Sequence, residues 1–147
     1  MTRIAIYNAL DVLAISSNVI YAAEKSIVWC APQSVTALFV RYGILKNMRT
    51  FLQRGGSVRA LIYAEDPSAE STRELVGADA DVRLVNHDPL DFVLVADGRE
   101  SISSLSVARG HLSPESPFAA FWTDEPSYAQ CLLFSFEEEW ALSSKYS

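Results

Sequence analysis

The sequence predicts an α/β protein with a mixed β-sheet and helices on both faces. Helical and strand-like apolar periods alternate over the first half of the chain, an order that gives parallel strands joined by helices. In the second half, two strand-like runs meet at Asp97-Gly98, a pair that favours a tight hairpin turn. We therefore expect antiparallel strands to extend a parallel sheet.

Length and composition are those of one ordinary domain. The chain has 147 residues, of which 50% are hydrophobic, so we expect a single domain over 1–147 with a real core. No apolar stretch approaches the roughly 18 residues needed to cross a bilayer, and no basic segment with an apolar leader opens the chain. We expect a soluble, cytoplasmic protein that does not contact membranes.

The first half alternates helix with strand. Asn8 can cap the first helix, Pro32 closes a short apolar strand that should be buried on both faces, and Gly55-Gly56 ends the second helix. The expected elements are a helix over 8–25, a strand over 26–32, a helix over 34–54, a strand over 57–64 and a helix over 66–77.

The second half is richer in strands. The hairpin turns at Asp97-Gly98, and Pro126 suits the first turn of a closing helix in which large apolar residues recur every four positions up to Trp140. The expected elements are strands over 81–87, 91–97, 100–106 and 118–123, and a helix over 125–142.

Charge argues against a nucleic-acid binder. The formal net charge is −6, and the 12 basic residues look scattered, whereas neutralising phosphates needs clustered Lys and Arg. We expect no direct contact with nucleic acid.

Motifs for cofactors and catalysis are missing. There is no Gly-rich phosphate loop at a strand-to-helix turn and no GxSxG elbow, so neither a nucleotide cofactor nor a serine nucleophile is expected. His87 and His111 are the two histidines, and neither has metal-ligand spacing. His87 could titrate near neutral pH and act as a base, but beside Asp88 it more often serves as a local hydrogen-bonding partner. We expect no cofactor and no metal.

Several segments, in order, resemble a single phospholipase D-like half. They are "AEKSIVWCAP", "LQRGGSVRALIY", "ADVRLV", "DFVLVADGRESISSLS" and "FWTDEPSYAQCLLFSFEEEW". The chain looks most like the degenerate phospholipase D-like sensor domains of TrmB-type transcription regulators and of some prokaryotic sensor kinases. Trp122, Asp124, Glu125, Phe136 and Trp140 match the end of that pattern.

The resemblance also implies a lost active site. Active members of the superfamily carry HxKxxxxD, with a nucleophilic His and a phosphate-binding Lys. When Asp97 is aligned with the Asp of that motif, Leu90 stands at the His position and Phe92 at the Lys position. A covalent phosphohistidine cannot form without an imidazole, and His87 would need a register that turns it to the other strand face. We expect no enzymatic activity.

Three functions follow from these observations. The first is a non-catalytic sensory or regulatory domain that binds a small ligand or a partner protein in signalling or transcription control. The second is a structural dimerisation or interaction subunit. The third is an atypical phosphodiesterase or nuclease that depends on His87. The expected partners are a second copy of the chain, a regulator or kinase, and a small molecule.

A ligand pocket could replace the former active site at the strand ends. The ordinary expectation for the aromatic residues is packing in the core, and for the two arginines it is salt bridges on an exposed strand face. The candidate lining residues are Trp29, Cys30, Tyr63, Phe92 and Trp122, with Arg59 and Arg83 as anion contacts and His87 as a further contact.

Overall fold

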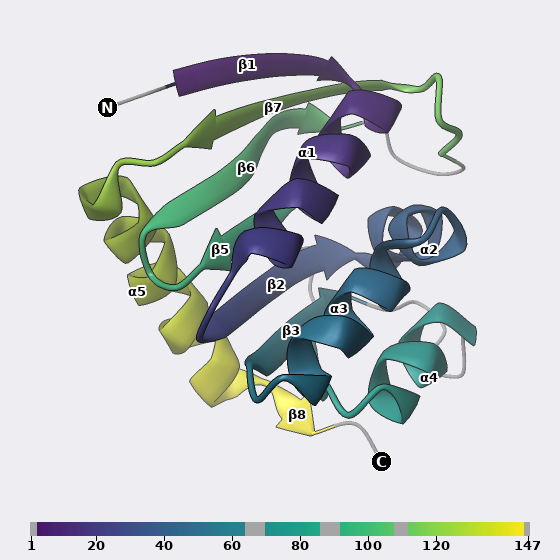
Figure 1. Cartoon of the computed structure of the whole chain (residues 1–147), viewed down its shortest axis with the longest axis vertical. Coiled ribbons are helices and arrows are strands. Elements are labelled where there is room, and N and C mark those ends of the chain that lie inside the picture. The colour runs from purple at the N-terminus through teal and green to yellow at the C-terminus, as the bar shows by residue number, and fades with distance from the viewer. Residues whose placement is uncertain (1–2, 64–69, 86–91, 108–111, 146–147) are drawn as a thin grey trace.

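The chain folds around one mixed β-sheet with helices on both faces (Figure 1). The computed structural model describes residues 3–63, 70–85, 92–107 and 112–145. Within these ranges the sheet has eight strands in the order β1-β7-β6-β5-β2-β3-β4-β8. The predicted fold class is confirmed.

The elements follow the predicted order, with additions at both ends. The strands are β1 (Arg3–Asn8), β2 (Ser26–Pro32), β3 (Ser57–Tyr63), β4 (Asp81–Val85), β5 (Val93–Ala96), β6 (Glu100–Val107), β7 (Pro117–Thr123) and β8 (Ser144–Lys145). The helices are α1 (Ala9–Ala22), α2 (Gln33–Arg41), α3 (Ile44–Gln53), α4 (Glu70–Gly77) and α5 (Pro126–Leu142).

Strand direction follows from the connections. Helices join β2, β3 and β4, and these three strands are parallel, as crossover connections require. The β5–β6 hairpin and β7 pair antiparallel on the other side of β2. Strands β2 to β4 therefore form one side of the sheet, and strands β5 to β7 extend it on the other.

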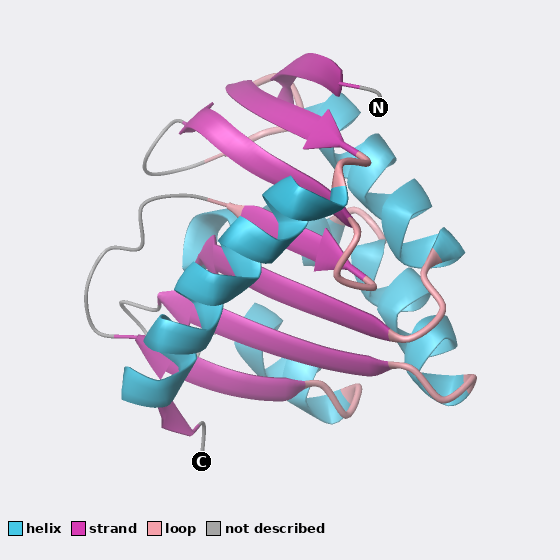
Figure 2. Cartoon of the chain, turned by 90° about the vertical axis from the view of Figure 1, so that its left-hand side faces the viewer, coloured by secondary structure: helices cyan, strands magenta, loops and turns pink. Residues whose placement is uncertain are grey.

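The two faces of the sheet carry cores of different size. Side chains from α1 to α4 pack with one face into the larger core, which includes Trp29 and Phe92. Figure 2 shows α5 crossing the other face, where Phe136 and Trp140 belong to a smaller core. Strand β2 contributes to both cores, so it is buried on both faces as predicted.

Strands β1 and β8 were not predicted. Ile4 of β1 pairs with Trp122 of β7, and Leu84 of β4 pairs with Ser144 of β8. Each short terminal segment becomes a strand because a distant strand offers it unpaired backbone groups. Local sequence patterns do not contain that information.

The expected helix over 34–54 is two helices. Gly43 has a φ of 106° and separates α2 from α3. Apolar side chains keep a helical spacing through the break, so this spacing does not reveal it.

No helix within the described ranges is long and apolar enough to cross a membrane.

Candidate functional site

The hairpin that carries the aligned motif has the expected turn. Asp97 and Gly98 both have positive φ, at 57° and 66°, and the Arg99 N–H donates to the Ala96 carbonyl at 3.0 Å. Positive φ at both central positions of the turn suits the twist of the paired strands, and residues 97–99 lie between the paired Ala96 and Glu100. The predicted hairpin is confirmed.

The Asp97 carboxylate binds backbone. It accepts hydrogen bonds from the N–H groups of Glu24 at 3.0 Å, Lys25 at 2.7 Å and Ser26 at 3.0 Å. Burial alone would raise the pKa of Asp97, but these three bonds and the Lys25 charge together bring it below its usual 3.8. Asp97 therefore ties the β5–β6 turn to the connection between α1 and β2.

Phe92, just before β5, lies inside an aromatic cluster. Its ring centroid is 4.9 Å from that of Trp29, 5.3 Å from that of Phe39 and 6.0 Å from that of Phe118. The exposed fraction of each side chain is 1% or less. At the position that the resemblance assigns to a phosphate-binding lysine, the side chain is part of the core.

Ser104 of β6 fixes the backbone of Phe92. The Phe92 N–H donates to Ser104 Oγ at 2.9 Å, and the Ser104 N–H donates to the Phe92 carbonyl, also at 2.9 Å. The strand pairing between β6 and β7 shifts register just after Ser104. This serine therefore closes the end of the hairpin and has its hydroxyl engaged.

The sheet separates the candidate lining residues. Trp29 and Phe92 touch within the larger core, and Trp122 packs against that same core. Cys30 and Tyr63 pack against the smaller core on the other face. Residues of neighbouring sequence position point to opposite faces of a strand, so these five do not line one pocket. Ligand binding by any of them stays a prediction.

Arg59 and Arg83 lie on the α5 face. The Arg59 guanidinium pairs with the Glu137 carboxylate, and the Nη1 to Oε2 distance is 3.1 Å. That hydrogen bond, against the effect of burial, lowers the pKa of Glu137. The Arg83 guanidinium lies 4.3 Å from the centroid of the Trp140 ring and donates to the Trp140 carbonyl. Both arginines hold α5 against the sheet.

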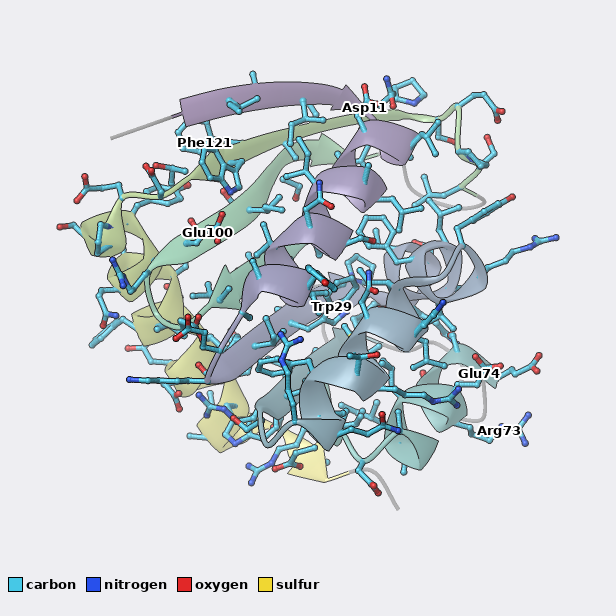
Figure 3. The ribbon with its side chains drawn as sticks, in the orientation of Figure 1. Asp11, Trp29, Arg73, Glu74, Glu100 and Phe121 are labelled. Atoms are coloured by element: carbon cyan, nitrogen blue, oxygen red, sulfur yellow. The ribbon has the colours of Figure 1, made fainter. Side chains whose placement is uncertain are left out.

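The remaining sequence candidates divide as follows. Trp122 is half-buried, and its indole N–H donates to Glu100 Oε2 at 2.8 Å. His87 and Leu90 lie outside the described residues. Figure 3 labels Trp29 beneath the helices and Glu100 on β6.

Among the described side chains, no group of three or more metal-ligating residues is gathered in one place.

Whole-chain comparison of structures gives the fold family. Nuc, a phospholipase D family member from Salmonella typhimurium, superposes with a TM-score of 0.78 over 99% of this chain and 97% of its own, at 17% identity. The chain has the phospholipase D-like fold. NucT from Helicobacter pylori agrees, with a TM-score of 0.79 over 99% of each chain at 12% identity.

A third protein with the phospholipase D-like fold corrects the expected partners. TrmBL2, an archaeal chromatin protein described as having a novel mode of DNA binding, superposes with a TM-score of 0.75 at 12% identity. The match covers 99% of this chain and 54% of TrmBL2, so this chain spans about half of that protein. The expectation of partners without direct nucleic-acid contact was wrong, because the same fold occurs in a DNA-binding protein.

Sequence comparison adds nothing to the phospholipase D-like assignment. No family model matches the chain, and no curated protein matches it. Structural similarity at identities of 17% and below shows only a shared fold, so the activity of each of these proteins is not transferred to this chain.

The sequence does contain one charge pattern that the net charge conceals. Six of the 12 basic residues and none of the 18 acidic residues fall between positions 25 and 64. Within this stretch, Arg41, Lys46, Arg49 and Arg54 are exposed and belong to, or directly follow, α2 and α3. The basic residues are therefore segregated, and counting charge by segment would have found them.

Proposed function

We propose that residues 1–147 form one non-catalytic regulatory domain of the phospholipase D-like fold. It acts in signalling or transcription control by binding a small ligand or a partner macromolecule. The observation that supports this most directly is the complete burial of Phe92 among Trp29, Phe39 and Phe118.

Phosphoryl transfer needs cations that reach the phosphate oxygens. Catalysis of this reaction rests mostly on positioning and on neutralising the developing charge. Phe92 has no donor and no charge, and its ring is 0% exposed. The resemblance also places Leu90 where the nucleophile would stand, and a leucine side chain cannot attack phosphorus.

The role of Asp97 supports the same proposal. An aspartate at the last position of HxKxxxxD could serve catalysis or could serve the structure. The Asp97 carboxylate accepts three backbone N–H bonds from residues 24–26, so this residue has a structural role. Its presence in the chain does not argue for a working active site.

A phosphodiesterase assay tests the proposal. We expect the purified chain to leave bis(p-nitrophenyl) phosphate unhydrolysed above the rate of buffer alone. The His87→Ala variant is the matched control, because His87 is the histidine nearest to the aligned motif. Turnover by the parent chain that disappears in His87→Ala would overturn the proposal and favour an atypical phosphodiesterase.

A second variant tests whether position 92 belongs to the core or to a site. Phe92→Lys puts an ammonium group among buried rings, and we expect it to lower the free energy of unfolding by at least about 3 kcal/mol. Phe92→Leu keeps an apolar side chain and should cost only about 1–2 kcal/mol. Urea unfolding measures both. A Phe92→Lys protein as stable as the parent would show that position 92 can reach solvent.

Nucleic acid is the partner macromolecule that we propose. TrmBL2 has the same fold over 99% of this chain and is described as binding DNA. The acid-free stretch over 25–64 supports this choice, because phosphate contacts come from clustered Lys and Arg.

A further inference from the structure

We propose that an exposed surface across α1 and α3 binds the phosphate backbone of a nucleic acid, which rests on the partner proposed above. The α1–α3 surface consists of Tyr21, Lys46, Arg49, Thr50 and Arg54. Figure 1 shows α1 and α3 side by side in front of the sheet, and the two helices contact each other.

Packing of α3 fixes which of its side chains face outward. Ile44, Leu45, Met48 and Phe51 are buried in the larger core. Lys46, Arg49 and Thr50 occupy the opposite side of the helix and are exposed. The core therefore presents the polar and basic residues of α3 to solvent.

Arg54 joins the two helices of the surface. Its Nη2 donates to the carbonyl oxygens of Tyr21 at 2.8 Å and Ala23 at 2.6 Å. Its guanidinium lies 5.4 Å from the centroid of the Phe51 ring. These contacts hold a charged group at the end of α1 next to Tyr21, whose side chain is 68% exposed.

The cations of this surface are available to an anion. Within the described ranges, the ion pair that the structure shows joins Arg59 to Glu137 and does not involve Lys46 or Arg49. Helix α3 has no acidic residue, and α1 has none after Asp11. Two exposed acidic residues border the surface: Asp79 lines a groove with Arg49 next to α4, and Glu24 follows Ala23, whose carbonyl accepts from Arg54.

Dimensions favour a nucleic-acid backbone. Lys46 and Arg54 are eight residues apart, which is about 12 Å along a helix. Phosphates of one DNA strand rise about 3.4 Å each along the duplex axis and also wind around it, so the surface matches about two or three of them. A membrane-surface helix would need an exposed apolar face, and the apolar side chains of α3 are buried or, for Leu52, half-buried against the larger core.

The test measures binding of a fluorescent 25-base-pair duplex DNA by anisotropy. With three cations in contact, we expect the association constant to fall about 40-fold between 50 and 200 mM salt. The double variant Lys46→Glu and Arg49→Glu should weaken binding at least 10-fold at 50 mM salt. Melting temperature checks that this variant stays folded, since both side chains are exposed.

The matched control carries the same change in net charge elsewhere. Arg73 lies on α4 (Figure 3) and Arg99 in the β5–β6 turn, and both are exposed. The double variant Arg73→Glu and Arg99→Glu should bind within about threefold of the parent. An equal loss in both double variants would overturn the α1–α3 surface while leaving nucleic acid as partner.

Other outcomes separate the surface from the proposed partner. No DNA binding by the parent at 50 mM salt would overturn both the surface and nucleic acid as partner. Binding of vesicles with 30% phosphatidylserine, without binding of DNA, would also overturn the proposal and assign the surface to anionic lipid.

Discussion

Asp97 and Phe92 occupy two positions of the aligned motif, and the fold uses each in its own way. The Asp97 carboxylate binds three backbone N–H groups of residues 24–26. The Phe92 ring is buried against Trp29 and Phe39. A charged side chain at position 97 is stabilised because hydrogen bonds replace its hydration. A charged side chain at position 92 would be surrounded by the aromatic rings of the core.

The hydrogen bonds of Asp97 predict a pH dependence of stability. Because its pKa is lower in the folded chain, Asp97 contributes stability above the pKa of the unfolded chain and loses it as pH falls through the folded value. We expect Asp97→Asn to cost about 1–3 kcal/mol at pH 7, and much less at pH 3. Urea unfolding at both pH values measures this.

Asp79→Asn is the control for that experiment. Asp79 also has a positive φ, at 72°, and its side chain is exposed. Both substitutions therefore place an asparagine at a left-handed backbone position. Its cost should stay within about 0.5 kcal/mol at either pH. A cost of Asp97→Asn that is equal at pH 3 and pH 7 would show that the charge on Asp97 contributes nothing.

At the scale of elements, Gly43 decides that 33–53 becomes two helices. Its φ of 106° is unfavourable for a residue with a Cβ, although no atom lies within 4 Å of the place where a Cβ would stand. The constraint is therefore conformational. Two helices with a break between them let α2 contact α4 while α3 contacts α1.

This predicts opposite effects for two glycine substitutions. Gly43→Ala should lower the free energy of unfolding by about 1–2 kcal/mol because of the left-handed backbone. Gly77→Ala, at the end of α4 and equally open to solvent, should be neutral or stabilise by up to about 1 kcal/mol. Thermal and urea unfolding compare the two variants. Equal costs would contradict the conformational explanation.

The whole molecule is tied together by pairings between distant parts of the chain. Strand β1 pairs with β7, and β8 pairs with β4, so both terminal segments belong to one sheet. Strand β2 contributes side chains to both cores. Loss of either core would expose this central strand, so the two cores should unfold together.

We therefore expect one cooperative unfolding transition. Far-UV circular dichroism should follow the secondary structure, and tryptophan fluorescence should follow Trp29 in the larger core and Trp140 in the smaller core. The two curves should have the same midpoint in urea. Separate midpoints would show that 1–147 does not behave as one domain.

Much of the architecture is readable from the sequence. The apolar run 26–32 predicted a strand buried on both faces, and Asp97-Gly98 predicted the hairpin. Both signals are local, because burial and turn geometry restrict side-chain type at each position. The candidate pocket could not be read in the same way, since the expected lining residues combine both faces of the sheet.

The sequence by itself determined the α/β class, the order of most helices and strands, and the acid-free stretch over 25–64. Only the tertiary structure decided that Phe92 is core, that Asp97 holds the α1–β2 connection and that β1 and β8 are strands. The spacing of apolar residues and the positions of charged residues can be read directly from the sequence. A side chain's partners depend on which distant segments the sheet brings beside it, and a single sequence does not state those pairings.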